Sequence, residues 1–90
     1  MNLTRNIKST ISQRKDLLDR NRNNYLILEL ASGESIFVFS GKVNQEKWPW
    51  LKEGQEINFT VEEGKNKANV LVDYVIDWGK ITYMYLTSQK

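Results

Sequence analysis

The chain lacks both cysteine and histidine, and it contains a single proline. Without cysteine it can form no disulfide framework, thiolate metal site or cysteine nucleophile. Without histidine it lacks the commonest general base and the commonest metal ligand. No glycine-rich phosphate loop, nucleophile elbow or metal-binding motif is present either. The sequence therefore predicts a protein that is not an enzyme, with no catalytic residues, no cofactor and no metal.

Long hydrophobic runs are also missing. No apolar segment approaches the roughly 18 to 20 residues needed to cross a bilayer, and the first residues carry no apolar signal segment. We therefore expect a cytoplasmic protein with no membrane partner. A length of 90 residues suits one domain, residues 1–90. So short a chain buries only about 60% of its unfolded surface.

The net charge is only +2, but the basic residues are unevenly distributed. Six of the 13 basic residues lie within residues 1–24, alongside two of the 11 acidic residues. A basic N-terminal segment of this kind, residues 1–22, is typical of contact with nucleic-acid phosphates, because neutralised phosphates release counterions. It is equally typical of a solvent-exposed surface that carries lysine and arginine.

The first 20 residues fit more than one kind of secondary structure. Helical spacing connects Leu3, Ile7, Ile11 and Leu18. The first three of these residues, together with Leu17, are odd-numbered and would also form one apolar face of a strand. A helix, a strand and a disordered arm therefore all stay open for this segment.

The rest of the chain has the pattern of β-strands separated by turns. The apolar, β-rich segments are residues 25–30, 36–39, 57–61, 68–76 and 81–86. Gly33 lies between the first two segments, where a tight hairpin requires a positive φ. Counted from Tyr25, the pattern predicts five strands.

The segment at residues 36–39 is apolar on both faces. Ile36 and Val38 point to one side, and Phe37 and Phe39 point to the other, because side chains alternate along a strand. A barrel core needs only one apolar face from each strand. The face with both phenylalanines is therefore either covered or available for binding.

This region resembles the cold-shock domain, a five-stranded barrel of the oligonucleotide/oligosaccharide-binding (OB) type. Residues 36–39 match the position of that family's second ribonucleoprotein motif, and the spacing through residues 51–62 contains no gap. Residues 68–70, Ala-Asn-Val, resemble the end of the family's next strand. The family's first motif, which supplies base-stacking aromatics, falls near residues 23–28, where Tyr25 is the single ring. The resemblance implies an OB-like barrel and binding of single-stranded nucleic acid.

Two tryptophans flank the proline in the sequence Trp48-Pro49-Trp50. Proline lacks an amide hydrogen and restricts the residue before it, so we expect this segment in a loop. One interpretation is that one or both indoles plug the end of the barrel. The other is that at least one indole is a stacking or anchor residue.

We therefore predict an all-β fold, a small five-stranded antiparallel OB-like barrel over residues 24–88, with an N-terminal helix or arm and an extra C-terminal strand. An Sm-like or SH3-like barrel is the alternative. The predicted function is a binding module for single-stranded RNA or DNA that uses aromatic stacking and basic contacts. The alternative is a protein-protein interaction module, such as a small subunit, adaptor or inhibitor, that uses the same aromatic surface. The candidate binding residues are Tyr25, Phe37, Phe39, Lys42, Trp48, Trp50, Lys65 and Lys67.

Overall fold

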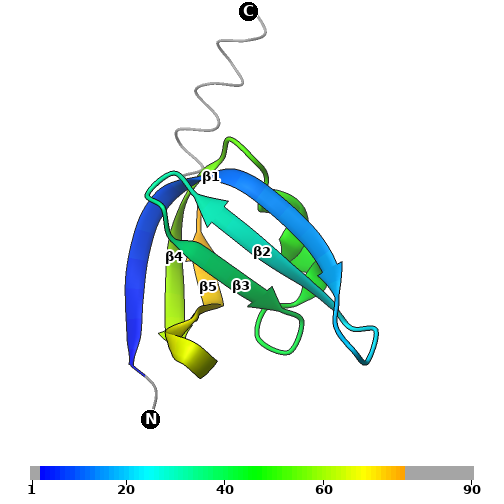
Figure 1. Ribbon diagram of the computed structural model, residues 1–90. Coiled ribbons are helices and arrows are strands. Elements are labelled where there is room, and N and C mark those ends of the chain that lie inside the picture. The colour runs from blue at the N-terminus through cyan, green and yellow to red at the C-terminus, as the bar shows by residue number, and fades with distance from the viewer. Residues whose placement is uncertain (1–2, 77–90) are drawn as a thin grey trace, which may run out of the picture.

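Five β-strands close into a barrel in the computed structural model, which describes residues 3–76 (Figure 1). The strands are β1 (Thr4–Leu18), β2 (Asn24–Leu30), β3 (Ser35–Phe39), β4 (Glu56–Glu63) and β5 (Asn69–Val75). Two 3-10 helices connect them, η1 (Gln45–Trp50) between β3 and β4 and η2 (Lys65–Lys67) between β4 and β5. The order around the barrel is β1-β2-β3-β5-β4, with β4 paired to β1. The prediction of an all-β, five-stranded barrel is confirmed.

Antiparallel pairing holds for all of these strand pairs except the β3–β5 pair, which is parallel. The β2–β3 hairpin turns at Gly33, whose φ of 93° is the positive value that the sequence predicted. The parallel contact is short and joins Ile36 to Asn69 and Phe37 to Val70. A tight turn imposes antiparallel pairing, whereas β3 and β5 meet across an intervening strand and two connections, so local turn chemistry does not set their direction.

The N-terminal segment is a strand of the barrel. Residues 4–10 of β1 pair with β4, and residues 11–18 pair with β2. A register shift between Ile11 and Gln13 lets this one long strand serve two partners. Ile7 and Ile11 of the predicted strand face are buried, at 6% and 0% exposure, whereas Leu3 and Leu17 of the same predicted face are 85% and 37% exposed. The alternative of a helix or arm is therefore wrong, and the barrel begins at Thr4 instead of residue 24.

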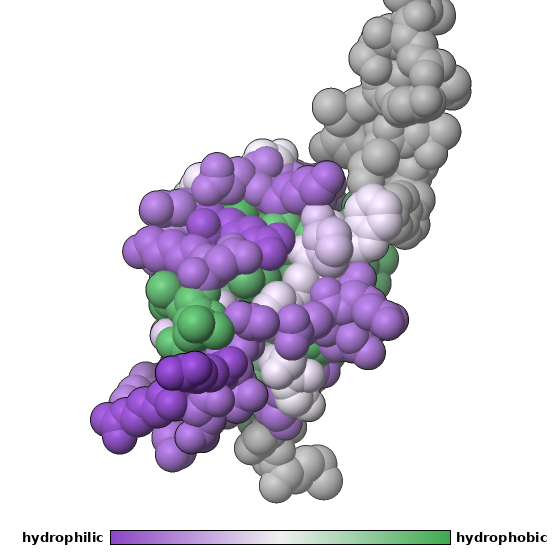
Figure 2. Space-filling view, turned by 90° about the vertical axis from the view of Figure 1, so that its right-hand side faces the viewer, coloured by the Kyte–Doolittle hydropathy of each residue, from purple (hydrophilic) through white to green (hydrophobic). Residues whose placement is uncertain are grey.

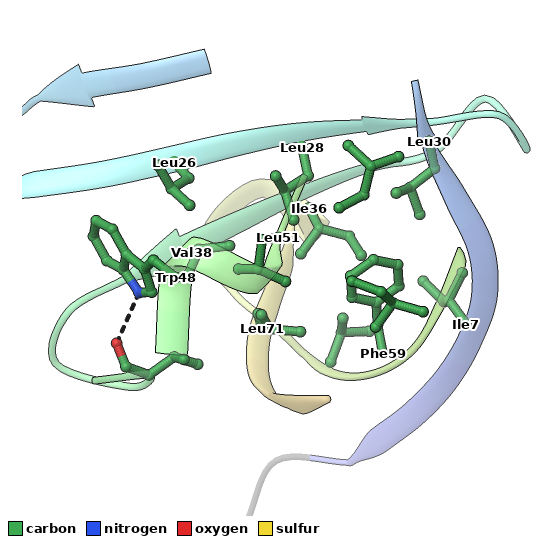
Figure 3. Packing of buried hydrophobic residues seen from close by; sticks show 14 of the residues in the cluster. Ile7, Leu26, Leu28, Leu30, Ile36, Val38, Trp48, Leu51, Phe59 and Leu71 are labelled. Carbon is green, nitrogen blue, oxygen red and sulfur yellow. Dashed lines mark hydrogen bonds between the residues drawn. The ribbon is translucent and has the colours of Figure 1, made fainter. Parts of the chain in front are cut away.

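The core is filled from one face of each strand (Figure 3). Buried side chains alternate along the strands as predicted, because only every second residue points inward. These side chains are Leu26, Leu28 and Leu30 of β2, Ile36 and Val38 of β3, and Ile57, Phe59 and Val61 of β4. Ile7 and Ile11 of β1 and Leu71 of β5 belong to the same cluster. Phe37 and Phe39 are thereby left on the outer face of β3.

Trp48 of η1 is part of this core. The residue is 6% exposed, and its Nε1 donates a hydrogen bond of 3.0 Å to the carbonyl oxygen of Val43 (Figure 3). Leu51, directly after η1, is fully buried in the same cluster. Trp50 is 49% exposed. The plug interpretation is therefore confirmed for Trp48, and this predicted stacking ring lies in the core instead of on a binding surface.

An arginine of β1 holds η1 against the barrel. Arg14 Nη1 donates hydrogen bonds of 2.9 Å to the carbonyl oxygens of Trp48 and Leu51. These carbonyls lie at the C-terminal end of η1, where the Trp48 carbonyl also accepts a hydrogen bond of 2.9 Å from the Leu51 amide. Arg14 Nε and Nη2 donate to the two carboxylate oxygens of Asp16, at 2.8 and 3.0 Å. The Asp16 carboxylate therefore orients the guanidinium that caps η1.

The Arg14–Asp16 pair predicts that the stability of the fold depends weakly on pH under acidic conditions. The hydrogen bond from Arg14 lowers the pKa of the Asp16 carboxyl. Burial raises this pKa by a smaller amount, and the charge of Arg14 lowers it further. A carboxyl whose pKa is lower in the folded state stabilises the fold at neutral pH, and this contribution is lost as the pH falls through the lowered value. Because the Asp16 side chain is 64% exposed, solvent screening limits the contribution to less than about 1 kcal/mol. Urea denaturation below about pH 4 should show a smaller loss of stability in Asp16→Asn than in the wild type; identical profiles would contradict the expectation.

Two further observations apply to the described part of the chain. Between residues 3 and 76, no helix is long and apolar enough to span a membrane. Over the same range, no three acidic side chains come together as a group that could hold a metal ion. The predicted C-terminal strand, residues 81–86, lies outside the described residues.

Candidate nucleic-acid interface

Three aromatic rings lie in a row across the outer face of β2 and β3. Tyr25 of β2 is the register partner of Phe39 of β3, because the two strands pair across the Gly33 turn. The ring centroids of Tyr25 and Phe39 are 5.8 Å apart, and those of Phe39 and Phe37 are 6.1 Å apart. Interplanar angles of 30° and 24° make both contacts stacked ones. We call these three residues the aromatic row.

The aromatic row is accessible to a ligand and already ordered. Phe39 is 38% exposed, and Tyr25 and Phe37 are half-buried. The rings pack against one another, which restricts the rotation of each side chain. A flat ligand that stacks on such a row loses little side-chain entropy on binding, because the rings are preorganised.

The aromatic row ends in a pocket of about 380 Å³. The pocket is lined by Phe37, Phe39, Lys65, Asn66, Ala68 and Val70. Val70 is the register partner of Phe37, so the parallel β3–β5 contact places the β4–β5 loop beside the rings. The lining is mainly apolar, and Lys65 and Asn66 supply its polar groups.

Short backbone contacts shape the β4–β5 loop. The Gly64 amide donates to the Ala68 carbonyl oxygen at 2.8 Å, and the Ala68 amide donates to the Lys65 carbonyl oxygen at 3.2 Å. A Cβ atom at position 64 would lie 2.7 Å from Val70 Cγ2, so the close approach of this loop to β5 requires glycine. Asn66 has φ 59° and ψ 31°, the left-handed conformation that asparagine tolerates better than most residues. The loop is therefore held in one shape at the edge of the pocket.

Basic side chains are found near the other end of the aromatic row, on the β1–β2 turn. The Asp19 carboxylate accepts hydrogen bonds from the amides of Asn21 and Asn23, at 2.8 and 2.9 Å. These bonds organise a turn in which Arg22 has a positive φ of 64°. Arg20 and Arg22 are exposed on this turn. The side of the molecule that carries the turn is mostly hydrophilic (Figure 2).

The structure brings together four of the eight predicted binding residues, namely Tyr25, Phe37, Phe39 and Lys65. Lys42 instead forms an ion pair with Glu62, with 2.9 Å between Nζ and Oε1, so its charge is already compensated. Lys67 lines a separate cavity of about 430 Å³ beside the start of β1. Trp50 lies on η1, and Trp48 is buried in the core.

Asn66 lines the pocket and was missed by the sequence analysis. Its signal was its place in the charged turn Glu-Gly-Lys-Asn-Lys, since asparagine is the non-glycine residue that most readily adopts a positive φ in such turns. The sequence alone did not reveal that this turn lies beside Phe37, which is 29 positions earlier in the chain.

A solved structure, the mitochondrial single-stranded DNA-binding protein Rim1 of S. cerevisiae, is similar to this chain with a TM-score of 0.66 and 18% sequence identity. The match covers 84% of this chain and 94% of that chain. This similarity and the closed five-stranded barrel together indicate the fold. The chain has an OB fold. No protein-family model matches the sequence, and no curated protein matches it either.

In this OB barrel, β2 and β3 are the strands to which the cold-shock resemblance assigned its two motifs. The OB part of that resemblance is confirmed at the level of the fold. Membership of the cold-shock family stays a prediction, because it has no support from a family match.

Proposed function

We propose that this OB barrel binds single-stranded DNA through the aromatic row. The observation that carries the proposal is the continuous stack of Tyr25, Phe39 and Phe37 leading into the pocket that Lys65 and Asn66 border. OB folds commonly bind oligonucleotides on the face of strands 2 and 3 and with the loops β1–β2 and β4–β5. In this chain the same face carries the three rings, and the same two loops carry arginine and lysine.

The chemistry of the surface fits a single strand better than a duplex. Unpaired bases offer their flat faces for stacking on aromatic side chains, and each stacked base contributes about 1 to 3 kcal/mol. In a duplex these faces are occupied by neighbouring bases. Basic side chains on the flanking loops supply the contacts to phosphate that give sequence-independent affinity.

DNA is proposed as the ligand because the structurally similar protein is a single-stranded DNA-binding protein. At 18% identity, this similarity supports the proposal through the shared fold and not through matched residues. RNA offers the same stacking faces, so it belongs in the test. We also propose a cytoplasmic location, as expected from the sequence.

Fluorescence anisotropy with labelled oligonucleotides of about 12 nucleotides tests the proposal at low and moderate salt. The ligands are oligo(dT), oligo(U) and a DNA duplex of the same length. We expect micromolar or tighter binding of oligo(dT) at low salt, with weaker binding of the duplex. Equal affinity for oligo(U) would extend the function to RNA. Absence of binding to both single strands at low salt would contradict the proposal and favour the use of the same aromatics as anchors for a protein partner.

Lys65→Gln is expected to reduce the salt dependence of binding. Each phosphate contact of a single strand contributes about 0.7 to the slope of log K against log salt concentration. Loss of one lysine contact should therefore lower the slope by about 0.7. Lys8→Gln is the matched control, because Lys8 is an exposed lysine on β1 opposite Asn58 of β4, away from β2 and β3. Equal slopes for the two variants would show that Lys65 does not contact phosphate.

A further inference from the structure

We propose that the pocket beside the aromatic row holds one nucleobase of the bound strand, and that the Asn66 carboxamide hydrogen-bonds the edge of this base. The proposal rests on the single-stranded DNA binding proposed above and adds a residue that reads base chemistry. Stacking alone is tolerant of sequence, because every base has a flat face. A contact to the base edge would make this one position of the site selective.

The walls of the pocket suit the faces of a flat ring. Phe37 and Phe39 border it on the β3 side, and Ala68 and Val70 border it on the β5 side. Pockets that bind small planar groups combine apolar walls with a few polar groups that set orientation. Here the lining residues that carry a polar side chain are Lys65 and Asn66, which are adjacent in the chain. An apolar ligand would make no polar contact with either residue. A nucleotide can offer the edge of its base to Asn66 and its phosphate to Lys65.

The backbone of the β4–β5 loop holds Asn66 in position. Asn66 has a left-handed conformation and lies inside the loop that is closed by two hydrogen bonds, one between Gly64 and Ala68 and one between Lys65 and Ala68. Its carboxamide makes no hydrogen bond with another residue in the range 3–76. A carboxamide presents a donor beside an acceptor, and this pair matches the donor and acceptor groups that lie side by side on base edges. The amide is therefore available to a base that enters the pocket.

Two substitutions separate this role from a structural one. Asn66→Gly removes the carboxamide and keeps a residue that adopts positive φ freely. We expect it to weaken oligo(dT) binding about 5- to 140-fold, the effect of losing a paired hydrogen bond to a base. Asn66→Asp replaces the donor by a second acceptor, and a carboxylate pairs well with the two neighbouring donors of guanine. This variant should bind alternating (dT-dG) more tightly relative to oligo(dT) than the wild type does.

The same anisotropy titrations test whether Asn66 contacts the base edge. Circular dichroism shows whether each variant is folded. Weaker oligo(dT) binding by Asn66→Gly, together with a shift towards (dT-dG) in Asn66→Asp, supports the proposal. If both variants keep the wild-type affinities, or if the (dT-dG) to oligo(dT) ratio stays unchanged in Asn66→Asp, base reading by Asn66 is wrong while DNA binding stands. If the wild type binds none of these oligonucleotides, the proposed function itself fails.

Discussion

Replacing Phe37 and Phe39 together by alanine is expected to weaken oligo(dT) binding about 25-fold or more while leaving the barrel folded. Each stacking ring contributes about 1 to 3 kcal/mol, and a factor of ten in affinity corresponds to about 1.4 kcal/mol. The fold should survive because both rings lie on the outer face of β3, whereas Ile36 and Val38 fill the core. Anisotropy titration measures the affinity, and thermal unfolding followed by circular dichroism measures the fold.

Two controls make this result specific. Phe39→Leu keeps an apolar side chain of similar bulk but removes the ring, so it should lose a part of the affinity if stacking matters. Val75→Ala truncates another exposed apolar residue, 64% exposed near the end of β5, and should leave binding unchanged. An unaltered affinity in the double variant would rule out the aromatic row as the binding surface. Loss of cooperative unfolding would instead show that the rings stabilise the barrel.

Trp48→Ala is expected to lower the free energy of unfolding by about 3 to 5 kcal/mol, the cost of truncating a large buried aromatic side chain. The indole fills the core at η1, and its removal also leaves the Val43 carbonyl without its hydrogen bond. Small domains have only about 5 to 15 kcal/mol of stability in total, so much of this variant should be unfolded at modest urea concentrations. Urea denaturation followed by circular dichroism measures the loss.

The control for Trp48 is the other tryptophan of the same 3-10 helix. Trp50 is 49% exposed, and Trp50→Ala should cost less than about 1 kcal/mol. Trp48→Phe keeps most of the packing and loses the indole hydrogen bond, so it should remain folded and bind oligo(dT) as the wild type does. If Trp48→Phe is folded but binds oligo(dT) more weakly than the wild type, Trp48 contributes to the binding surface. That result would contradict its assignment to the core.

Alternation of side chains was a reliable guide along β3 and β4. Ile57 and Phe59 alternate with polar residues along β4, and both are buried. The same reasoning separated Ile36 from Phe37, which the structure places in the core and on the outer face respectively. The pattern was sufficient here because the period of a strand is a local property of the backbone.

Local pattern was not sufficient for the N-terminal segment. Ile7 and Ile11 are four positions apart, a spacing that suits one face of a helix and one face of a strand equally well. Pairing with β4 and β2 selects the strand, because these partners satisfy the backbone hydrogen bonds along nearly the whole of β1. The partners come from distant parts of the chain, and no short window of sequence contains them.

The tryptophans differ in the same way. The proline between Trp48 and Trp50 correctly predicted a break from strand structure, but the two indoles flank the same proline and differ in exposure, at 6% and 49%. The difference arises because η1 directs Trp48 into the barrel, with Arg14 of β1 bonding the carbonyls at the end of the helix. A contact between residues more than 30 positions apart therefore helps to hold η1 in the orientation in which Trp48 is buried.

Alternation along the chain was enough to predict an all-β fold and to place Phe37 and Phe39 on the face of their strand opposite Ile36 and Val38, and the resemblance to the cold-shock domain supplied the barrel. The grouping of those rings with Tyr25, Lys65 and Asn66 followed only from the barrel, because strand register and the parallel β3–β5 contact bring these residues together. The two-residue period of a strand can be recognised from neighbouring residues in the sequence. The partners of that strand depend on how the whole chain closes its core.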